Sequence, residues 1–511
     1  MERLQLGAPA EAAVLTADQG AEPAATVVRA LRHPTAWFAA AGFVASALIV
    51  VAGGRVGTVQ VNIPLTTWFG LLSRSGYRPG ESLVPGMLLM AGIAGLVLLW
   101  LALVRGRHPA VRTEQHVWLV AGAWVTPLLV GPPLLSNDVY SYAAQGMLVD
   151  RGLDPYSVGP SALGNIPAVG AVDPAWRSVP SPYGPLATWF QHFAVVIAGG
   201  NPLGAVIVFR LVAAGCVVAI GLLAAALAGS RRIPALTLTV LNPLVLLQVI
   251  SAAHLEGLLC MLLLGALLAH RRGNHLLGIV LGCAAAAIKV PALIVVLAGI
   301  VARQRGARPN WLAVASDAGV AIATCLGLTM LVPHGWGWAS TLNTPALNYT
   351  SGAPASLLAD VLHLFIRWAS FDDLAMAGRA AALLAAACIV IYLIATTRQR
   401  PLEVTVGFGL LAVALLSPVI YPWYLLWGVL CLAPIARGRL REVLVVICAS
   451  ASAMAVPGLP GYVADLIAAG LAGCAVVMLV GAREPRERRI PLVASVTDRV
   501  SGYASIGRGS R

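Results

Sequence analysis

Charged residues are scarce in this sequence. Asp, Glu, Lys and Arg make up 11% of the 511 residues, 59% are apolar, and the mean hydropathy is +0.83. Water is therefore not the main solvent of this chain. The composition predicts an all-α polytopic membrane protein rather than a soluble domain.

The sequence also lacks the motifs of common metal and nucleotide sites. It has no Cys-x-x-Cys pair, no His-Glu-x-x-His and no Gly-rich phosphate loop. All eight cysteines fall in apolar runs, which indicates small buried hydrophobic residues rather than disulfides or metal ligands. Lys289 is the only lysine, and because Val290 follows it, a Walker-type ATP site is excluded.

The net charge is +13, and all of the positively charged residues except Lys289 are arginines. The arginines cluster in alternate short loops, near residues 105–112, 231–232, 271–272, 303–308, 398–400, 437–441 and 483–489. This spacing follows the positive-inside rule, so we expect these loops in the cytoplasm and residues 136–202 outside. It argues against a nucleic-acid-binding surface.

The apolar stretch 276–302 lies between two arginine clusters, with Lys289 at its centre. A single span there would place every later cluster outside, whereas a hairpin of 276–288 and 290–303 keeps them inside. We therefore predict a hairpin of two short segments with Lys289 at its tip, near the outer leaflet. A charge at membrane depth is costly and usually functional, although a snorkelling or ion-paired lysine is the alternative.

With the hairpin counted as two, we expect about 14 membrane segments and cytoplasmic termini. A span needs about 20 apolar residues. The other segments are 35–53, 85–104, 117–135, 203–228, 233–251, 255–270, 311–331, 374–397, 402–420, 423–436, 441–457 and 461–482.

The predicted domain organisation is simple. Residues 1–34 show no apolar core of a signal peptide and are expected to be a disordered cytoplasmic tail. Residues 35–482 form the transmembrane domain, and 483–511 a basic cytoplasmic tail. Three further segments are amphipathic or short and are expected to lie along the outer interface: 138–150, 186–199 and 354–370.

The loop 136–202 concentrates carboxylates, tyrosines and amides, which indicates a site for sugar chemistry. Nucleotide sugars are absent outside the cell, so a sugar donor there must be lipid-linked. Its phosphate can leave without an acid, but the acceptor hydroxyl needs a general base and the departing phosphate needs cations. Asp138, directly after the third span, is the predicted base; helix N-capping is the alternative.

Tyr140 and Tyr142 flank this base and are candidates for sugar contact or for anchoring at the membrane interface. Arg151 is a substrate-binding candidate that could instead pair with Asp150.

Two outer turns supply further candidates. His254 and Glu256 are expected to bind substrate hydroxyl groups, with a cap and turn role as the alternative. Tyr421 and Trp423 could form a sugar platform or part of an aromatic belt.

Lys289 is the first candidate for the donor phosphate and Arg367 the second. Three charged residues in apolar runs receive no role: Asp317, Arg210 and Asp465.

Five segments carry a resemblance to a known family: 137–146, 152–156, 182–185, 241–244 followed by His254, and 422–424. They resemble the actinobacterial polyprenol-phosphate-mannose-dependent α-1,6-mannosyltransferases, which have the GT-C glycosyltransferase fold. The match covers most of the membrane core, and its first block is specific.

The resemblance implies a plasma-membrane enzyme with its active site on the outer face. It implies polyprenyl-phosphate-mannose as donor and a phosphatidylinositol-mannoside or lipomannan as acceptor. The transfer would extend the mannan backbone of lipomannan and lipoarabinomannan, with inversion at the anomeric carbon of mannose. The chain length favours the elongating members. GT-C enzymes use an acidic residue of the first large outer loop as catalytic group, and in this chain that residue corresponds to Asp138. Many of them have an acidic pair there, but residue 137 is Asn, so we expect no required metal or other cofactor.

Two other functions stay open at this point. The enzyme could transfer arabinose or glucose from a polyprenyl carrier. Alternatively, the protein could be a polyprenyl-lipid flippase in which Asp138 and Lys289 bind the translocated headgroup.

Overall fold

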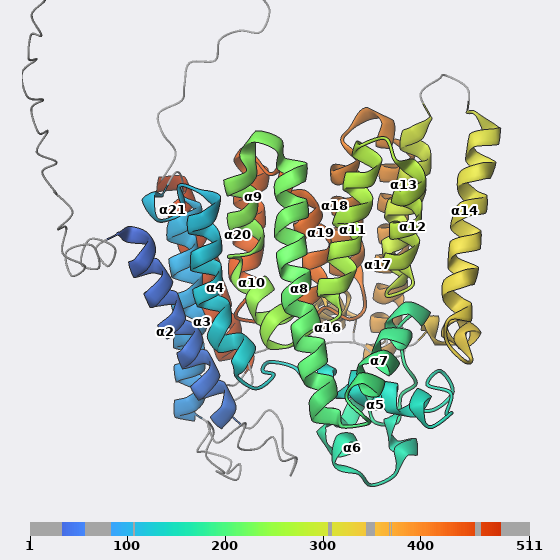
Figure 1. Ribbon diagram of the computed structural model, residues 1–511, viewed down its shortest axis with the longest axis horizontal. Helices are drawn as coiled ribbons and strands as arrows, with labels where there is room; N and C mark the ends of the chain where they lie inside the picture. Colours follow the sequence, from blue (N-terminus) through green and yellow to red (C-terminus); the bar gives the residue numbers. More distant parts are fainter. Residues whose placement is uncertain are drawn as a thin grey trace, which may run out of the picture.

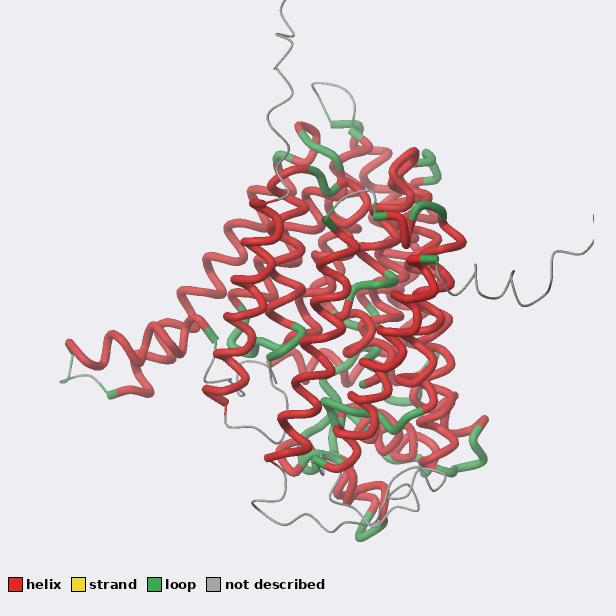
Figure 2. The backbone as a smooth tube through the Cα atoms, turned by 90° about the vertical axis from the view of Figure 1, so that its left-hand side faces the viewer, coloured by secondary structure: helices red, strands yellow, loops and turns green. Residues whose placement is uncertain are grey.

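The computed structural model describes residues 33–56, 83–105, 108–304, 309–343, 353–366, 368, 370–454 and 461–481. These residues form helices and connecting loops without a strand, and most of the helices run along one common direction (Figures 1 and 2). The all-α class is therefore confirmed for the described part. Residues 1–32 of the predicted N-terminal tail (1–34) and all of the predicted C-terminal tail (483–511) lie outside the described residues, as does Arg367.

The main helices follow the apolar runs of the sequence. They are α2 Pro34–Arg55, α3 Leu83–Val104, α4 Glu114–Val130, α5 Asp138–Asp150, α6 Pro167–Ala171, α7 Pro185–Ile197, α8 Pro202–Ala228, α9 Arg232–Thr239, α10 Pro243–Val245, α11 Glu256–Arg271, α12 His275–Ala286, α13 Leu293–Arg303, α14 Trp311–Met330, α16 Pro354–Phe365, α17 Phe371–Ala395, α18 Leu402–Leu416, α19 Leu425–Leu432, α20 Gly438–Ala451 and α21 Gly461–Gly481.

Five of the described helical spans are long and apolar enough to cross a membrane by length and composition, and a sixth results if one bent pair is counted. Several other apolar helices, such as α12, α13 and α18, have only 10–17 residues. The protein is thus a membrane-embedded helical protein. The count of 14 segments stays a prediction.

The hairpin predicted at Lys289 is confirmed. Helices α12 and α13 pack together, with Lys289 in the turn between them. Gly278 and Gly299 both lie against the His270 ring, and Gly282 lies against Val296. Residue numbers that rise on one helix thus pair with numbers that fall on the other, so the two helices are antiparallel.

The prediction of one continuous span at 233–251 is wrong. Helix α9 ends at Thr239, and a new helix starts at Pro243, where the Asn242 side chain accepts a hydrogen bond from the Leu244 amide. Proline has no amide hydrogen and favours the first turn of a helix, which explains this break. The following turns, Leu246–Ser251, are π-helical, and the chain then bends by 120° before α11.

The arginines at the α8–α9, α11–α12 and α19–α20 connections meet at one end of the bundle. Arg232 pairs with Glu114 at the start of α4, and Arg271 lies 3.6 Å from Glu403 at the start of α18. Arg231 donates a hydrogen bond of 3.1 Å to the carbonyl of Ala436. Helices α5, α6 and α7 lie at the opposite end (Figure 1).

Candidate active site

Asp138 is the first residue of α5, where the chain turns after α4. Its amide donates to the Ser136 hydroxyl at 3.1 Å, and Leu135 just before it has a φ of +70°. A leucine rarely adopts this left-handed conformation, and such strain is concentrated at functional sites. The buried Arg210 of α8 stabilises the start of this loop, because it donates hydrogen bonds to the carbonyls of Gly131, at 2.8 Å, and Leu128.

His254 lies at the 120° bend between the π-helical turns and α11. The residue before it, Ala253, also has a left-handed φ of +56°. The Gln248 carbonyl accepts from the His254 amide at 3.2 Å and lies 2.9 Å from Nδ1 of the ring. Leu134 of the Asp138 loop donates to the Ser251 carbonyl at 3.3 Å. This bond ties the two strained corners together.

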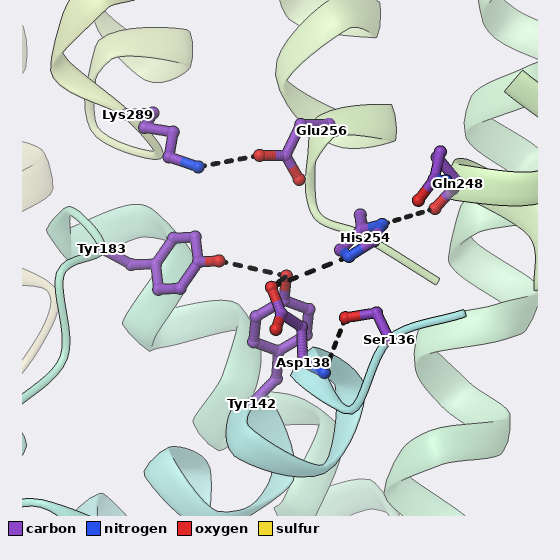
Figure 3. Close-up of polar contacts among 8 residues, drawn as sticks. All are labelled: Ser136, Asp138, Tyr142, Tyr183, Gln248, His254, Glu256 and Lys289. Carbon is purple, nitrogen blue, oxygen red and sulfur yellow. Dashed lines mark hydrogen bonds and ion pairs between the residues drawn. The ribbon is translucent and has the colours of Figure 1, made fainter. Parts of the chain in front are cut away.

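The corners bring Asp138 and His254 into contact (Figure 3). Nε2 of His254 lies 3.7 Å from Oδ2 of Asp138. The Tyr142 hydroxyl donates to the same oxygen at 3.5 Å and lies 3.1 Å from the Tyr183 hydroxyl, so Tyr183 donates in turn to Tyr142. Burial raises the pKa of the Asp138 carboxyl, which makes it a stronger base than an exposed aspartate.

Lys289 and Glu256 form an ion pair above this group. Nζ of Lys289 lies 2.8 Å from Oε1 of Glu256, whose side chain is 1% exposed (Figure 3). Nζ also lies 4.0 Å from the centre of the Tyr424 ring and 5.2 Å from those of Tyr183 and Trp427. The aromatic faces and the carboxylate together hold the ammonium group in place. Oε2 of Glu256 is buried and makes no hydrogen bond to the described residues.

Gly184 fixes the Tyr183 segment to the tip of the hairpin. Its amide donates to the Ile288 carbonyl at 3.1 Å, and the Leu186 amide donates to the Ala287 carbonyl at 3.0 Å. A Cβ atom at Gly184 would lie 2.3 Å from the Ala287 oxygen. Only glycine allows this approach, and the approach sets Tyr183 beside Lys289.

The aromatic candidates line another side of the site. The Trp423 ring stacks on His254 with centroids 4.0 Å apart, and the Tyr421 ring stacks on Trp423 at 4.4 Å. Flat aromatic faces suit contact with the C–H groups of a sugar ring.

Seven of the ten predicted site residues meet here: Asp138, Tyr142, His254, Glu256, Lys289, Tyr421 and Trp423. Tyr140 lies on a different face of α5 and is buried. Arg151 ends α5, about 20 Å along the helix from Asp138. It contacts the Leu163 carbonyl, so the structure does not bring it to the site.

Sequence reasoning missed two contributors. Tyr183 and Tyr424 both stand in motifs that carried the family resemblance, but only contacts across the fold give them a role. The expected alternative of an Asp150–Arg151 pair is not what the structure contains, because Asp150 lies 3.6 Å from His192 of α7.

Two of the three unassigned charges have partners. Asp317 of α14 pairs with Arg303 of α13, which fixes α14 to the hairpin, and Arg210 holds the end of α4. Asp465 is exposed on α21. The described residues contain no group of three His, Cys, Asp or Glu side chains that could hold a metal ion. The residue before Asp138 is Asn137, not a second carboxylate.

Comparison with known proteins assigns the chain to a family. Residues 39–305 match the N-terminal domain of the α-(1→6)-mannopyranosyltransferases, and residues 355–483 match the MptB C-terminal domain. The chain belongs to the α-(1→6)-mannopyranosyltransferase family. This confirms the family, and with it the class of enzyme, that the sequence motifs indicated.

Individual relatives agree with this assignment. The chain is 31% identical to α-(1→6)-mannopyranosyltransferase A of Mycobacterium tuberculosis, over 78% of this chain and 80% of that protein. It is 28% identical to α-(1→6)-mannopyranosyltransferase B of Corynebacterium glutamicum, over 68% of this chain and 65% of that protein. No solved structure matches the chain.

Proposed function

We propose that this protein transfers mannose from polyprenyl-phosphate-mannose to an α-1,6-mannan acceptor, with Asp138 as general base. The observation that supports this most is the partly buried Asp138, which follows the strained Leu135 and faces His254 and Tyr142 in a chain of the α-(1→6)-mannopyranosyltransferase family. The acceptor would be a phosphatidylinositol-mannoside or the growing lipomannan chain, as in the elongating members.

In this reaction the acceptor 6-hydroxyl oxygen attacks C1 of the donor mannose. Asp138 takes the hydroxyl proton, a C1–O bond forms, and the bond between C1 and the phosphate oxygen breaks with its electron pair on the phosphate. Attack from the face opposite the phosphate inverts the anomeric centre. Tyr142 and Tyr183 hold the Asp138 carboxylate in position through their chain of hydrogen bonds.

Lys289 is proposed to face the donor phosphate. Its ammonium group carries three hydrogens, of which the Glu256 contact needs one, so it retains hydrogen-bonding capacity for a phosphate oxygen. Glu256, through its unpaired Oε2, would accept a hydroxyl of the bound sugar. Tyr421 and Trp423 would offer the sugar an aromatic face.

The orientation follows from charge. The arginine-rich connections gather at one end of the bundle and α5 lies at the other, which under the positive-inside rule supports a site at the outer face of the plasma membrane. A lipid-linked donor is the form of activated sugar available there. The GT-C arrangement with 14 segments and cytoplasmic termini remains part of this proposal.

The test is a reaction with purified full-length protein in detergent or proteoliposomes. Radiolabelled polyprenyl-phosphate mannose, arabinose and glucose are offered separately with a short α-1,6-mannoside. We expect label transfer from the mannose donor alone, in a product cleaved by an α-1,6-specific mannosidase. Transfer from another donor would replace the sugar assignment. Movement of the donor across proteoliposomes without any product would favour the flippase.

A further inference from the structure

The orientation of the His254 ring defines which of its nitrogen atoms carries hydrogen. Nδ1 lies 2.9 Å from the Gln248 carbonyl oxygen, which can only accept a hydrogen bond. Nδ1 is therefore the protonated nitrogen, and Nε2 of the neutral ring has a free lone pair. The Trp423 ring, stacked at 4.0 Å and inclined by 24°, keeps the imidazole in this orientation.

That lone pair is aimed at the base. Nε2 is fully buried, makes no hydrogen bond to the described residues, and lies 3.7 Å from Oδ2 of Asp138. A carboxylate oxygen and a bare nitrogen are both acceptors, so the contact is unfavourable while neither has a proton. One proton placed between them turns it into a hydrogen bond and draws the two groups together. The geometry therefore favours the protonated carboxyl, which is the product of base catalysis.

We propose that His254 is the proton partner of Asp138, so that the two side chains share the proton removed from the acceptor hydroxyl. This inference rests on the transfer reaction proposed above. The proton passes from the acceptor oxygen to Oδ2 of Asp138 as the new C1–O bond forms, and Asp138 then donates a hydrogen bond to Nε2. The proton leaves the pair for solvent or the released phosphate before the next turnover. Because His254 stabilises protonated Asp138, it makes the carboxylate a stronger base.

Other titratable groups also face the pair, and they act differently. Glu256 and Lys289 lie above it as an ion pair, so their opposite charges largely offset each other. The hydroxyl of Tyr142 donates to Asp138 and favours the carboxylate, opposite to His254. Behind these lie the hydroxyls of Tyr183, Tyr421 and Tyr424. The direction of a pH shift therefore identifies which partner has been removed.

The chain contains its own control. Asp150, at the other end of the Asp138 helix α5, forms a second carboxylate–imidazole contact with His192 of α7 at 3.6 Å, and there both side chains are solvent-accessible. His192→Phe removes an imidazole ring that lies at a similar distance from a carboxylate, far from Asp138.

The experiment is the pH profile of kcat/KM for mannosyl transfer by the full-length wild type, His254→Phe, His254→Gln and His192→Phe. His254→Phe removes the acceptor nitrogen and keeps a ring to stack on Trp423. His254→Gln replaces the ring with an amide whose NH2 can donate to the carboxylate, which also favours unprotonated Asp138. Activity requires unprotonated Asp138 and is lost as pH falls through the pKa of the pair. We expect the acidic limb of both variants to move to lower pH by about one unit, and kcat above it to fall about tenfold. The His192→Phe profile should match the wild type.

An unmoved limb would overturn the pairing, and a limb moved to higher pH would show that His254 donates to Asp138 instead. If wild-type protein transfers mannose and the limb does not move, only this inference fails; if wild-type protein transfers none, the proposed function fails as well.

A second measurement leaves His254 intact, in case its variants misfold. In the infrared difference spectrum of wild type minus Asp138→Asn, recorded below the acidic limb where Asp138 is protonated, a proton shared with nitrogen gives a broad carboxyl band at lowered frequency. A sharp, unshifted band would contradict the pairing.

Discussion

Replacing Asp138 with asparagine removes the proton acceptor and little else. Asparagine has the same size, and the backbone contact to Ser136 is unaffected. The contacts of the Asp138 side chain to Tyr142, at 3.5 Å, and to His254, at 3.7 Å, are long. A general base typically contributes about 10²–10⁴-fold to the rate. We expect kcat of Asp138→Asn to fall by that factor while the KM for donor and acceptor changes little.

The fold of this variant should be at least as stable as that of the wild type. Burial raises the folded-state pKa of Asp138 above its unfolded value, so the native state binds this proton more readily than the unfolded state does. As pH rises through the interval between the two values, this difference costs stability, and the cost persists at neutral pH. Asparagine has no such cost, so Tm should stay equal or rise.

The assay is transfer of labelled mannose by purified protein, with Tm measured on the same preparations. Asp150→Asn is the matched control, because it makes the same chemical change at the exposed end of the same helix. That control should keep full activity. If Asp138→Asn retains more than about a tenth of wild-type kcat, Asp138 is not the base.

Three further predictions concern the surroundings of Asp138 and the orientation of the protein in the membrane. Lys289→Met should raise the donor KM and slow turnover, and it should lower stability by about 3–5 kcal/mol because it leaves Glu256 buried and unpaired. If the double variant Lys289→Met/Glu256→Gln recovers activity as well as Tm, Lys289 does not bind phosphate. Gly184→Ala should destabilise the protein by about 1–3 kcal/mol and lower kcat, because its Cβ would meet the Ala287 carbonyl. Gly215→Ala, which lies in open space on α8, should do neither, and equal Tm values for the two variants would refute the close approach at Gly184. After replacement of the exposed Cys388 and Cys474 by serine, Ser340→Cys should react with an impermeant thiol reagent from outside intact cells and Arg400→Cys should not; the opposite labelling would reverse the orientation.

The sequence predicts the hairpin well and singles out Asp138 as the candidate base, both for physical reasons. One lysine in an apolar stretch between two arginine clusters leaves few arrangements that keep later arginines on one side, and α12 and α13 match the prediction. Asp138 stands out because a carboxylate directly after a span has no packing reason to be there. Both conclusions depend on a charged residue in an apolar stretch. Because a charge in a membrane segment is costly, its position in the sequence alone indicates where it can lie.

The parts that could not be predicted depend on contacts between distant residues. Tyr183 acts on Asp138 through Tyr142, 41 positions away in the chain, and Gly184 positions it against the hairpin. The break at Pro243 and the π-helical turns disrupt what hydropathy shows as one uniform run. Hydropathy measures transfer into lipid and is insensitive to where a buried helix bends.

Asp150 shows the same limit on the surface. Its neighbour in sequence, Arg151, is a plausible partner by charge, but the packing of α7 on α5 brings His192 to the carboxylate instead.

The most direct test of the account is a structure of the Asp138→Asn variant trapped with polyprenyl-phosphate-mannose and a short α-1,6-mannoside. The slowed variant should hold both substrates. We predict that the acceptor 6-hydroxyl lies within roughly 2.6–3.2 Å of the residue 138 side chain and in line with the bond from C1 to the phosphate oxygen. An acceptor hydroxyl bound far from residue 138, or facing another carboxylate, would contradict the assignment of Asp138 as the base.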